Sequence, residues 1–179
     1  MIKGDDIYIR PFTGLDSVSL LNLQTSNREF FEKFSMSRSS HYYSLDNQMK
    51  LIEKWNDNQE KDREYNFGIF KSESDELIGT VNLFQVIRGS LQSAFIGYFL
   101  AEKQNGKGYT TKAVKLIVDY AFNNLQLHRI EAGVMPHNIG SIRVLEKAGF
   151  HKEGIAKKNV KINGRWEDHQ VLAIIHPND

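Results

Sequence analysis

Apolar and polar residues alternate along several short stretches of the chain, a period that is typical of β-strands. These stretches are 7–12, 65–70, 77–87, 93–100 and 129–135. Pro136 ends the last of them, because proline has no N–H to donate to a neighbouring strand. Two further alternating runs, 155–162 and 165–175, enclose Asn163-Gly164. Asn-Gly between two such runs is the strongest short signal for a β-hairpin, so we expect one at the end of the sequence.

Apolar residues three and four positions apart predict helices between these strands. Segment 26–34 carries three phenylalanines at this spacing, and Ser44 can cap a second helix whose apolar face includes Ile52 and Trp55. The strongest helical pattern runs from Val114 to Leu125, and Thr110 or Thr111 stands where its N-cap is expected.

A last helix is expected from about Ile139. Asn138 is its expected N-cap, and Gly149 is expected to end it. The order of elements is therefore strand, two helices, three strands, helix, strand, helix and hairpin. No repeat, low-complexity tract or linker interrupts residues 1–179. This order predicts one α/β (mixed α+β) domain, a mixed sheet with helices on its faces.

The composition narrows the possible chemistry. The chain has no cysteine, which excludes disulfides, thiolate metal ligands and a cysteine nucleophile. The net charge of +1 offers no long-range attraction to nucleic acid or to a membrane, and we interpret the basic run 157–161 as a solvated face. His41, His137 and His151 are too scattered to suggest a metal site. With no signal-like or membrane-spanning stretch, we expect a soluble, cytoplasmic protein.

One glycine-rich segment, AEKQNGKGYTTKAV at 101–114, joins a strand to the strongest helix. The start of a helix offers free N–H groups and the positive end of the helix dipole, which together favour an anion such as phosphate. The glycine spacing fits neither a Walker loop nor the dinucleotide fingerprint GxGxxG. Taken alone, the segment is also compatible with a tight surface turn.

The surrounding motifs resemble those of the GNAT superfamily of N-acetyltransferases, in particular the RimJ/RimL-like branch that acetylates protein N-terminal amines. They are IGYFLAEKQNGKGYTTKAV (96–114), HRIEAGVMPHNIGSIRVLEKAGFHKEG (128–154) and KINGRWEDH (161–169). The resemblance covers roughly residues 7 to 175. It implies a twisted, mostly antiparallel sheet of about seven strands, helices on both faces and a C-terminal β-hairpin. In that fold two parallel strands, here 94–100 and 129–135, splay apart.

The resemblance also implies that acetyl-CoA is the cosubstrate and lies between the splayed strands. The main chain of Phe99, Leu100 and Ala101 would pair with its pantetheine. The loop that would wrap its pyrophosphate comprises Asn105, Gly106, Lys107, Gly108, Tyr109 and Thr110. Two of these positions depart from the family pattern Gln/Arg-x-x-Gly-x-Gly/Ala, since Asn105 replaces Gln or Arg and Thr110 replaces Gly or Ala. We expect weaker rather than lost affinity.

For the chemistry, the resemblance implies that Asn138 and Ser141 face acetyl-CoA. Asn138 would hold the pantetheine, and Ser141 would donate to the sulfur of coenzyme A. The tyrosine that serves as acid in many members would fall at Asn159 or Ala148, so that role is not filled in the usual way.

The general base remains open among several residues. His169 can take a proton near neutral pH, and Glu29 lies in the segment that would border the acceptor. Further candidates are His41, Glu167 and Asp168, and an ordered water could also relay the proton. Along WEDH, strand alternation places Glu167 and His169 on one face.

We therefore expect an enzyme that transfers acetyl from acetyl-CoA directly to a primary amine in a ternary complex, because the usual covalent route needs a cysteine. The expected acceptor is the N-terminal α-amine of a protein, of the ribosomal-protein type. A small amine such as a polyamine, amino acid or antibiotic, a non-catalytic acyl-CoA sensor and a nucleotide-binding regulator are the alternatives. We expect no metal and no nucleic-acid or membrane partner, and a monomer or a homodimer.

Overall fold

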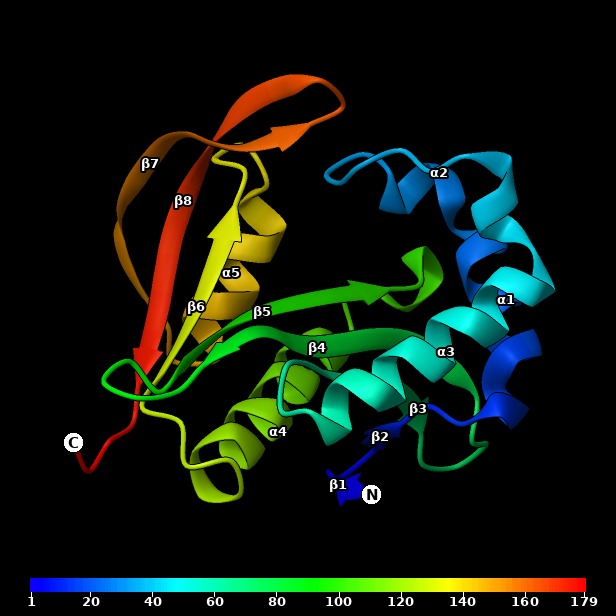
Figure 1. Ribbon diagram of the computed structural model, residues 1–179, viewed down its shortest axis with the longest axis horizontal. Helices are drawn as coiled ribbons and strands as arrows, with labels where there is room; N and C mark the ends of the chain where they lie inside the picture. Colours follow the sequence, from blue (N-terminus) through cyan, green and yellow to red (C-terminus); the bar gives the residue numbers. More distant parts are fainter.

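One eight-stranded sheet runs through the computed structural model, which describes residues 1–179 (Figure 1). Its strands lie in the order β1-β2-β3-β4-β5-β6-β8-β7. They are β1 (Ile2–Lys3), β2 (Ile7–Pro11), β3 (Tyr65–Lys71), β4 (Leu77–Ile87), β5 (Ser93–Leu100), β6 (Arg129–Val134), β7 (His151–Ile162) and β8 (Arg165–Ile175). Only β5 and β6 run parallel. The mixed, mostly antiparallel sheet with a C-terminal hairpin is confirmed, and the two-residue β1 is an addition to the seven expected strands.

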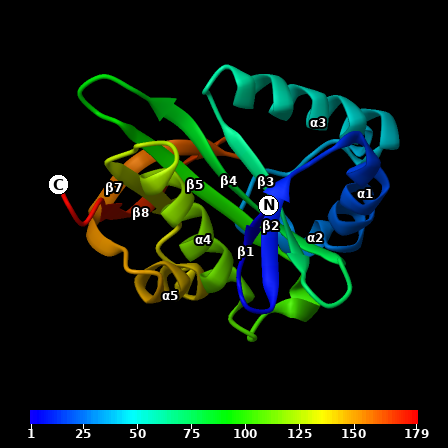
Figure 2. The ribbon, with the colours of Figure 1, turned by 90° about the horizontal axis from the view of Figure 1, so that it is seen from below.

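Helices cover both faces of the sheet (Figure 2). On one face lie α1 (Ser17–Ser26), α2 (Arg28–Phe31) and α3 (Leu45–Glu60), and on the other lie α4 (Tyr109–Asn123) and α5 (Ile139–Lys147). Short 3₁₀ turns are η1 (Gly14–Asp16), η2 (Ser40–Tyr43) and η3 (Glu102–Gln104). None of these helices combines the length and apolar character that a membrane-spanning segment needs.

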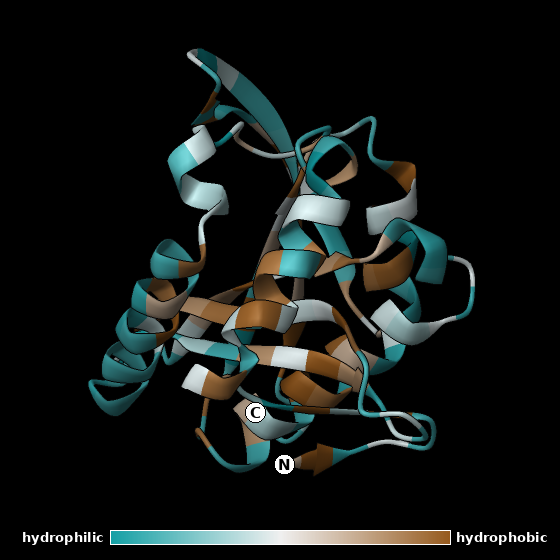
Figure 3. Ribbon diagram, turned by 90° about the vertical axis from the view of Figure 1, so that its right-hand side faces the viewer, coloured by the Kyte–Doolittle hydropathy of each residue, from teal (hydrophilic) through white to brown (hydrophobic).

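The main core lies between the sheet and helices α4 and α5. The apolar stripe of α4 is buried as its spacing predicts, with Val114, Ile117 and Ala121 wholly inaccessible to solvent. A smaller cluster of Phe12, Leu20 and Ile52 fixes α1 and α3 to the opposite face. Figure 3 shows hydrophobic residues gathered in these central layers, whereas the projecting tip of the β7–β8 hairpin is hydrophilic.

Several predicted helix ends are confirmed. The Ser44 side chain accepts a hydrogen bond from the N–H of Asn47 at 3.2 Å, and the Asn138 side chain accepts one from the N–H of Ser141 at 3.3 Å. Gly149 follows the end of α5 with a φ of +100°. Asn163 and Gly164 also have left-handed φ values, as a two-residue hairpin turn requires.

Two predictions about helices are wrong. Thr110 or Thr111 was expected to cap α4, but the helix begins at Tyr109 and its N-cap is Gly108, with a left-handed φ of +82°. A left-handed glycine turns the chain into the helix here, so the threonines fall within the first turn. The single helix expected at 26–34 is only one turn, α2, and the longer α1 before it was not predicted.

The sheet divides between β5 and β6. Only Ser93 to Phe95 pair with Arg129 to Glu131. Beyond this point β5 continues with β4 alone, and β6 continues with β8 alone. The two strands therefore share a short parallel junction and then separate, which confirms the expected splayed pair.

Arg129 supports this junction through two carboxylates. Its side chain donates to Glu131 on the same strand at 2.8 Å and to Glu153 on β7 at 2.9 Å. The hydrogen bonds that Glu153 accepts from Arg129, together with one from His151, lower the pKa of Glu153 to about 2 from its ordinary value of 4.5. The ionised carboxylate of Glu153 is thus favoured by folding.

Replacement of Glu153 with glutamine should lower the free energy of unfolding at pH 7 by about 1 kcal/mol, the upper end for partly exposed ion pairs. Because the pKa of Glu153 is lower in the folded protein, its stabilisation is present above pH 4.5 and is lost as the pH falls toward 2. Urea unfolding of both proteins across this range should show the difference shrinking. A difference that stays constant down to pH 2 would contradict this assignment.

Candidate functional site

The separated strands present main-chain polar groups that have no partner strand. The N–H of Ala101 donates to the carbonyl of Ile78 on β4 at 2.8 Å, and Leu100 lies opposite Gly79 between such bonds. The N–H and C=O of Leu100 therefore point away from β4, into the space between β5 and β6 beyond their short junction. This space is called the gap below. Main-chain direction alternates along a strand, so Tyr98 and Ile96 face the gap as well.

The opposite edge of the gap belongs to β6. The carbonyl of His128 accepts from His176 at 2.8 Å, on the β8 side. By the same alternation, Gly133 presents its main chain to the gap. The gap therefore has main-chain donors and acceptors on both sides, the arrangement that an extended ligand with amide groups can use in place of a strand.

The loop after β5 carries an unusual run of free donors. None of the six backbone N–H groups from Gly106 to Thr111 donates to an acceptor in the protein, and the helical bonds begin at Lys112. A helix by itself leaves about four such groups. Gly106 and Gly108 have φ values of +81° and +82°, which turn successive N–H groups toward one concave side. The loop is a preformed site for an anion at the start of α4.

The side chains of this loop mostly bind within the protein. The Asn105 amide donates to the carbonyls of Ala101 at 3.4 Å and Glu102 at 3.3 Å, so it closes η3. Gln104 is buried and accepts from Lys107 Nζ at 3.3 Å. Lys112 forms an ion pair with Asp6 at 2.8 Å. The loop can therefore hold an anion mainly through its main chain.

On the α4–α5 face, one side-chain contact spans the gap. The Tyr98 hydroxyl lies 2.6 Å from Ser141 Oγ and 3.2 Å from the Ser141 carbonyl oxygen. Burial raises the pKa of Tyr98 to about 12, although the hydrogen bond with Ser141 acts in the opposite direction. The phenol is therefore protonated at neutral pH and can donate. Sequence reasoning missed Tyr98, because a tyrosine in a strand gives no signal of a partner 43 residues away.

On the opposite face, His169 is buried near the other edge of the gap. Its Nδ1 lies 2.9 Å from Asn159 Oδ1 and 3.1 Å from the carbonyl oxygen of Glu167. The carbonyl oxygen can only accept, so Nδ1 carries the proton and Nε2 carries the lone pair. A methyl group built on Gly133 would lie 3.8 Å from both Cβ and Cδ2 of His169, so this side of the residue lies against β6.

The other candidate bases are either exposed or paired with groups within the protein. Glu29 and His41 are exposed. Asp168 Oδ1 accepts from the N–H of Lys158 at 2.8 Å, and Glu167 faces Arg165 at 3.8 Å. The described residues contain no cluster of histidine, aspartate and glutamate that could hold a metal ion.

Two distant segments meet beside the separated strands. Phe31 packs on Phe99 of β5 with ring centroids 5.0 Å apart, and Phe34 packs on His137, just after β6, at 5.4 Å. The N–H of Ser37 donates to Asn163 at the hairpin tip, as the approach of these segments in Figure 1 also shows. The segment after α2 therefore borders the gap on the face that carries His169.

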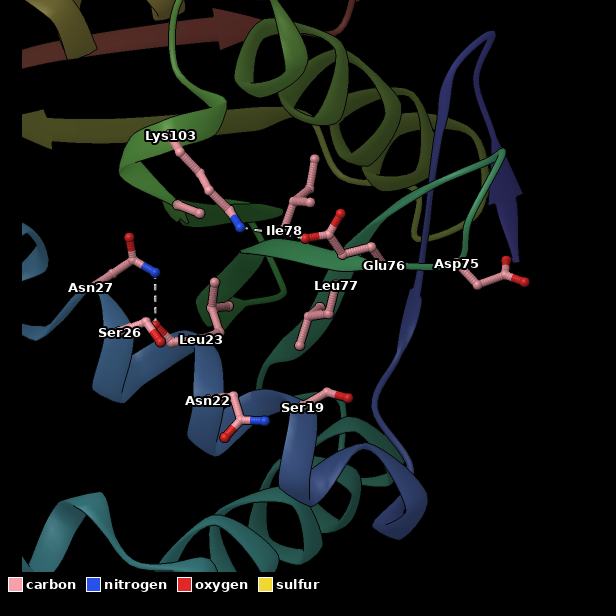
Figure 4. Close-up of a pocket in the computed structure, with 11 residues that line it drawn as sticks. Ser19, Asn22, Leu23, Ser26, Asn27, Asp75, Glu76, Leu77, Ile78 and Lys103 are labelled. Carbon is pink, nitrogen blue, oxygen red and sulfur yellow. Dashed lines mark hydrogen bonds and ion pairs between the residues drawn. The ribbon is translucent and has the colours of Figure 1, made fainter.

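A separate pocket of about 300 Å³ lies between α1, the start of β4 and η3 (Figure 4). Lys103 reaches across it toward Glu76 at 3.9 Å, and Asn27 accepts from the N–H of Glu102 at 2.9 Å. The pocket contains neither Ser141 nor His169. Its lining residues come mainly from α1, the start of β4 and η3, and none belongs to the loop 106–111.

Comparison with known proteins agrees with this geometry. The family model "Acetyltransferase (GNAT) domain" matches residues 6–151. The chain is 64% identical over 179 residues to the Bacillus subtilis (strain 168) protein named "Probable N-acetyltransferase YjcK", covering 100% of this chain and 99% of that protein. It is 33% identical over 178 residues to the ribosomal protein uS5 alanine N-acetyltransferase of Escherichia coli (strain K12), covering 99% and 91%.

Solved structures show the same fold. The ribosomal-protein-S5-alanine acetyltransferase of Vibrio fischeri superposes with a TM-score of 0.91 at 28% identity, covering 98% of this chain and 96% of that one. Mycobacterium smegmatis RimJ, solved in complex with CoA-disulfide, superposes with a TM-score of 0.90 at 28% identity, covering 96% and 83%.

Replacement of Gly108 with alanine should weaken binding of coenzyme A about tenfold, because a side chain disfavours the left-handed φ that the anion loop requires. An added methyl group meets no atom within 4 Å at Gly108 or at Gly14, and only Gly108 has a left-handed φ. Gly14→Ala is therefore the matched control and should bind normally. Calorimetric titration with coenzyme A measures both, and equal affinities would contradict the role of the loop.

Proposed function

Because the chain belongs to the GNAT acetyltransferase family and is an acetyl-CoA-dependent N-acetyltransferase, we propose that its acceptor is the N-terminal α-amine of a protein. The observation that supports acetyl-CoA as cosubstrate is the divided sheet, whose unpaired main chain leads directly to six free N–H groups at the start of α4. The acceptor class is supported by relatives named for the alanine of ribosomal protein uS5.

These residues fit acetyl-CoA, which supplies the thioester that the amine attacks. The loop from Gly106 to Thr111 would hold the pyrophosphate through backbone N–H groups. The main chain of Tyr98 and Leu100 would pair with the pantetheine amides, while the N–H of Ala101 is already bound to Ile78. Asn138 caps α5 and lies on the same side of the gap, where its remaining amide donors can hold the pantetheine.

His169 is the proposed general base. Its Nε2 carries the lone pair, since Nδ1 is fixed by Glu167 and Asn159, and the ring lies beside Gly133 at the edge of the gap. It can take a proton from the acceptor amine directly or through one water. Ser141 Oγ, from the opposite face, would donate a hydrogen bond to the departing sulfur. The two groups approach the gap from opposite sides, as direct attack in a ternary complex requires.

The surroundings of the gap favour a peptide over a polyamine as acceptor. A polyamine needs carboxylates for its additional charges, and two of those near the gap, Glu32 and Asp168, are engaged within the protein, whereas Glu29 is exposed. Glu32 accepts from the N–H of Arg38 and the hydroxyl of Tyr43, both at 2.9 Å, and Asp168 accepts from Lys158. Half-buried Asn82 of β4 lies beside Gly97 of β5, on the face that carries His169, and an amide can bind both the N–H and the C=O of a peptide.

A peptide beginning with alanine should be acetylated at its α-amine, whereas the same peptide with a blocked N-terminus and spermidine should be turned over at least tenfold more slowly. Thiol release from acetyl-CoA gives the rate without protein background, because the chain has no cysteine. Mass spectrometry locates the acetyl group. Preferential acetylation of spermidine would show a small-amine enzyme, and coenzyme A binding without turnover of any amine would show a sensor.

Replacement of His169 with glutamine should reduce kcat/KM for the peptide by about 10²- to 10⁴-fold, the usual contribution of a general base. Binding of acetyl-CoA should change little, because His169 lies on the acceptor face. His41→Gln is the matched control, since His41 is exposed and its side chain has no hydrogen-bond partner. Normal turnover by His169→Gln would assign the base to another group.

A further inference from the structure

Tyr98 and Ser141 belong to opposite sides of the divided sheet. Tyr98 lies on β5, in the part of the strand that has left β6, and Ser141 lies in the first turn of α5, which follows β6. Their hydroxyls are 2.6 Å apart, so a short hydrogen bond crosses the gap on the α4–α5 face. If Ser141 donates to the departing sulfur as proposed, this contact lies next to the thioester.

The hydroxyl of Ser141 is not needed to complete the helix. Serine in the first turn of a helix often bonds to the main chain. Here the Asn138 side chain already accepts the N–H of Ser141 at 3.3 Å, and Ser141 Oγ has Tyr98 as its one partner in the protein. Because Asn138 caps the helix, the Ser141 hydroxyl remains available to bond a group outside the helix.

The direction of the Tyr98–Ser141 bond follows from the chemistry of the two groups. The Tyr98 hydroxyl also lies 3.2 Å from the Ser141 carbonyl oxygen, which can only accept. Burial favours the protonated phenol, since it raises the pKa of Tyr98. We assign Tyr98 as the donor and Ser141 Oγ as the acceptor, because a phenol is a stronger acid than an aliphatic alcohol and the 2.6 Å contact with Oγ is the shorter of the two. A serine that accepts from a neighbour keeps its single proton for a different acceptor, and such chains of hydroxyls polarise one another.

We propose that Tyr98 is a positioning residue for acetyl transfer, which donates to Ser141 Oγ and so directs the one proton of Ser141 into the gap toward the leaving sulfur. The proposal rests on the proposed function. It assigns to Tyr98 an action on Ser141 alone, with no proton lost from the phenol. Tyr98 thereby contributes to the donor side of a site whose usual tyrosine positions hold Asn159 and Ala148.

A double-mutant cycle with Tyr98→Phe and Ser141→Ala tests this action. Tyr98→Phe keeps the buried ring and should lower kcat about tenfold, while KM for acetyl-CoA stays within threefold. In the Ser141→Ala background the same change should have no further effect on kcat, because the serine proton that it orients is gone. Tyr120→Phe is the matched control, since the ring of Tyr120 packs on Phe67 and its hydroxyl has no hydrogen-bond partner.

Each outcome of the cycle has a distinct meaning. If Tyr98→Phe lowers kcat equally in both backgrounds, Tyr98 does not act through Ser141 and the proposal is overturned. A loss of kcat accompanied by a lower midpoint of thermal unfolding or by weaker coenzyme A binding would show a structural role and overturn it too. Unchanged kcat for Tyr98→Phe would overturn it as well. If Ser141→Ala turns over normally, the role of Ser141 fails with it, although acetyl transfer stands. Absence of turnover in the unaltered protein, with coenzyme A bound, would instead refute the proposed function.

Discussion

Every polar group of a buried main chain needs a hydrogen-bond partner, and this protein leaves a row of them without one. The parallel junction of β5 and β6 lasts for three residue pairs, and then both strands continue with a single neighbour each. The row leads into the loop before α4, where further N–H groups are free. A bound ligand with amide groups at one end and phosphates at the other satisfies both, so the division of the sheet defines the kind of cosubstrate.

The division of the sheet also separates two kinds of chemistry. On the α4–α5 face, the hydroxyl groups of Tyr98 and Ser141 lie in contact and form the proposed donor side for the departing sulfur. On the other face, the imidazole of His169 is held beside Gly133 of β6, with its Nδ1 bonded to Asn159 and Glu167. Gly97 of β5 and Gly133 of β6 have no side chains on this face, where Asn82 and His169 lie beside them. In the proposed mechanism, His169 therefore acts on the amine from one side while Ser141 acts on the sulfur from the other.

Local patterns in the sequence were sufficient for most of the fold, because strands, caps and the hairpin turn depend on residues close together in the chain. Segment 17–26 was missed because its serines, asparagine and threonine are weak helix formers, and α1 depends on packing by Leu20 and Leu23. The cap of α4 was misassigned because a left-handed glycine took the place of a threonine. The pair of Tyr98 with Ser141 needs the folded sheet, so no local pattern could indicate it.

The central claim is that one ligand occupies both the gap and the loop. Hydrogen exchange, followed residue by residue with and without coenzyme A, measures this directly, since an amide that gains an acceptor exchanges more slowly. We expect added protection at the gap-facing N–H groups of Tyr98 and Leu100 and along Gly106 to Thr111, with little change at Ala101, which is bound to Ile78 in either state. Protection confined to the pocket between α1 and η3, with none in the gap, would contradict the account.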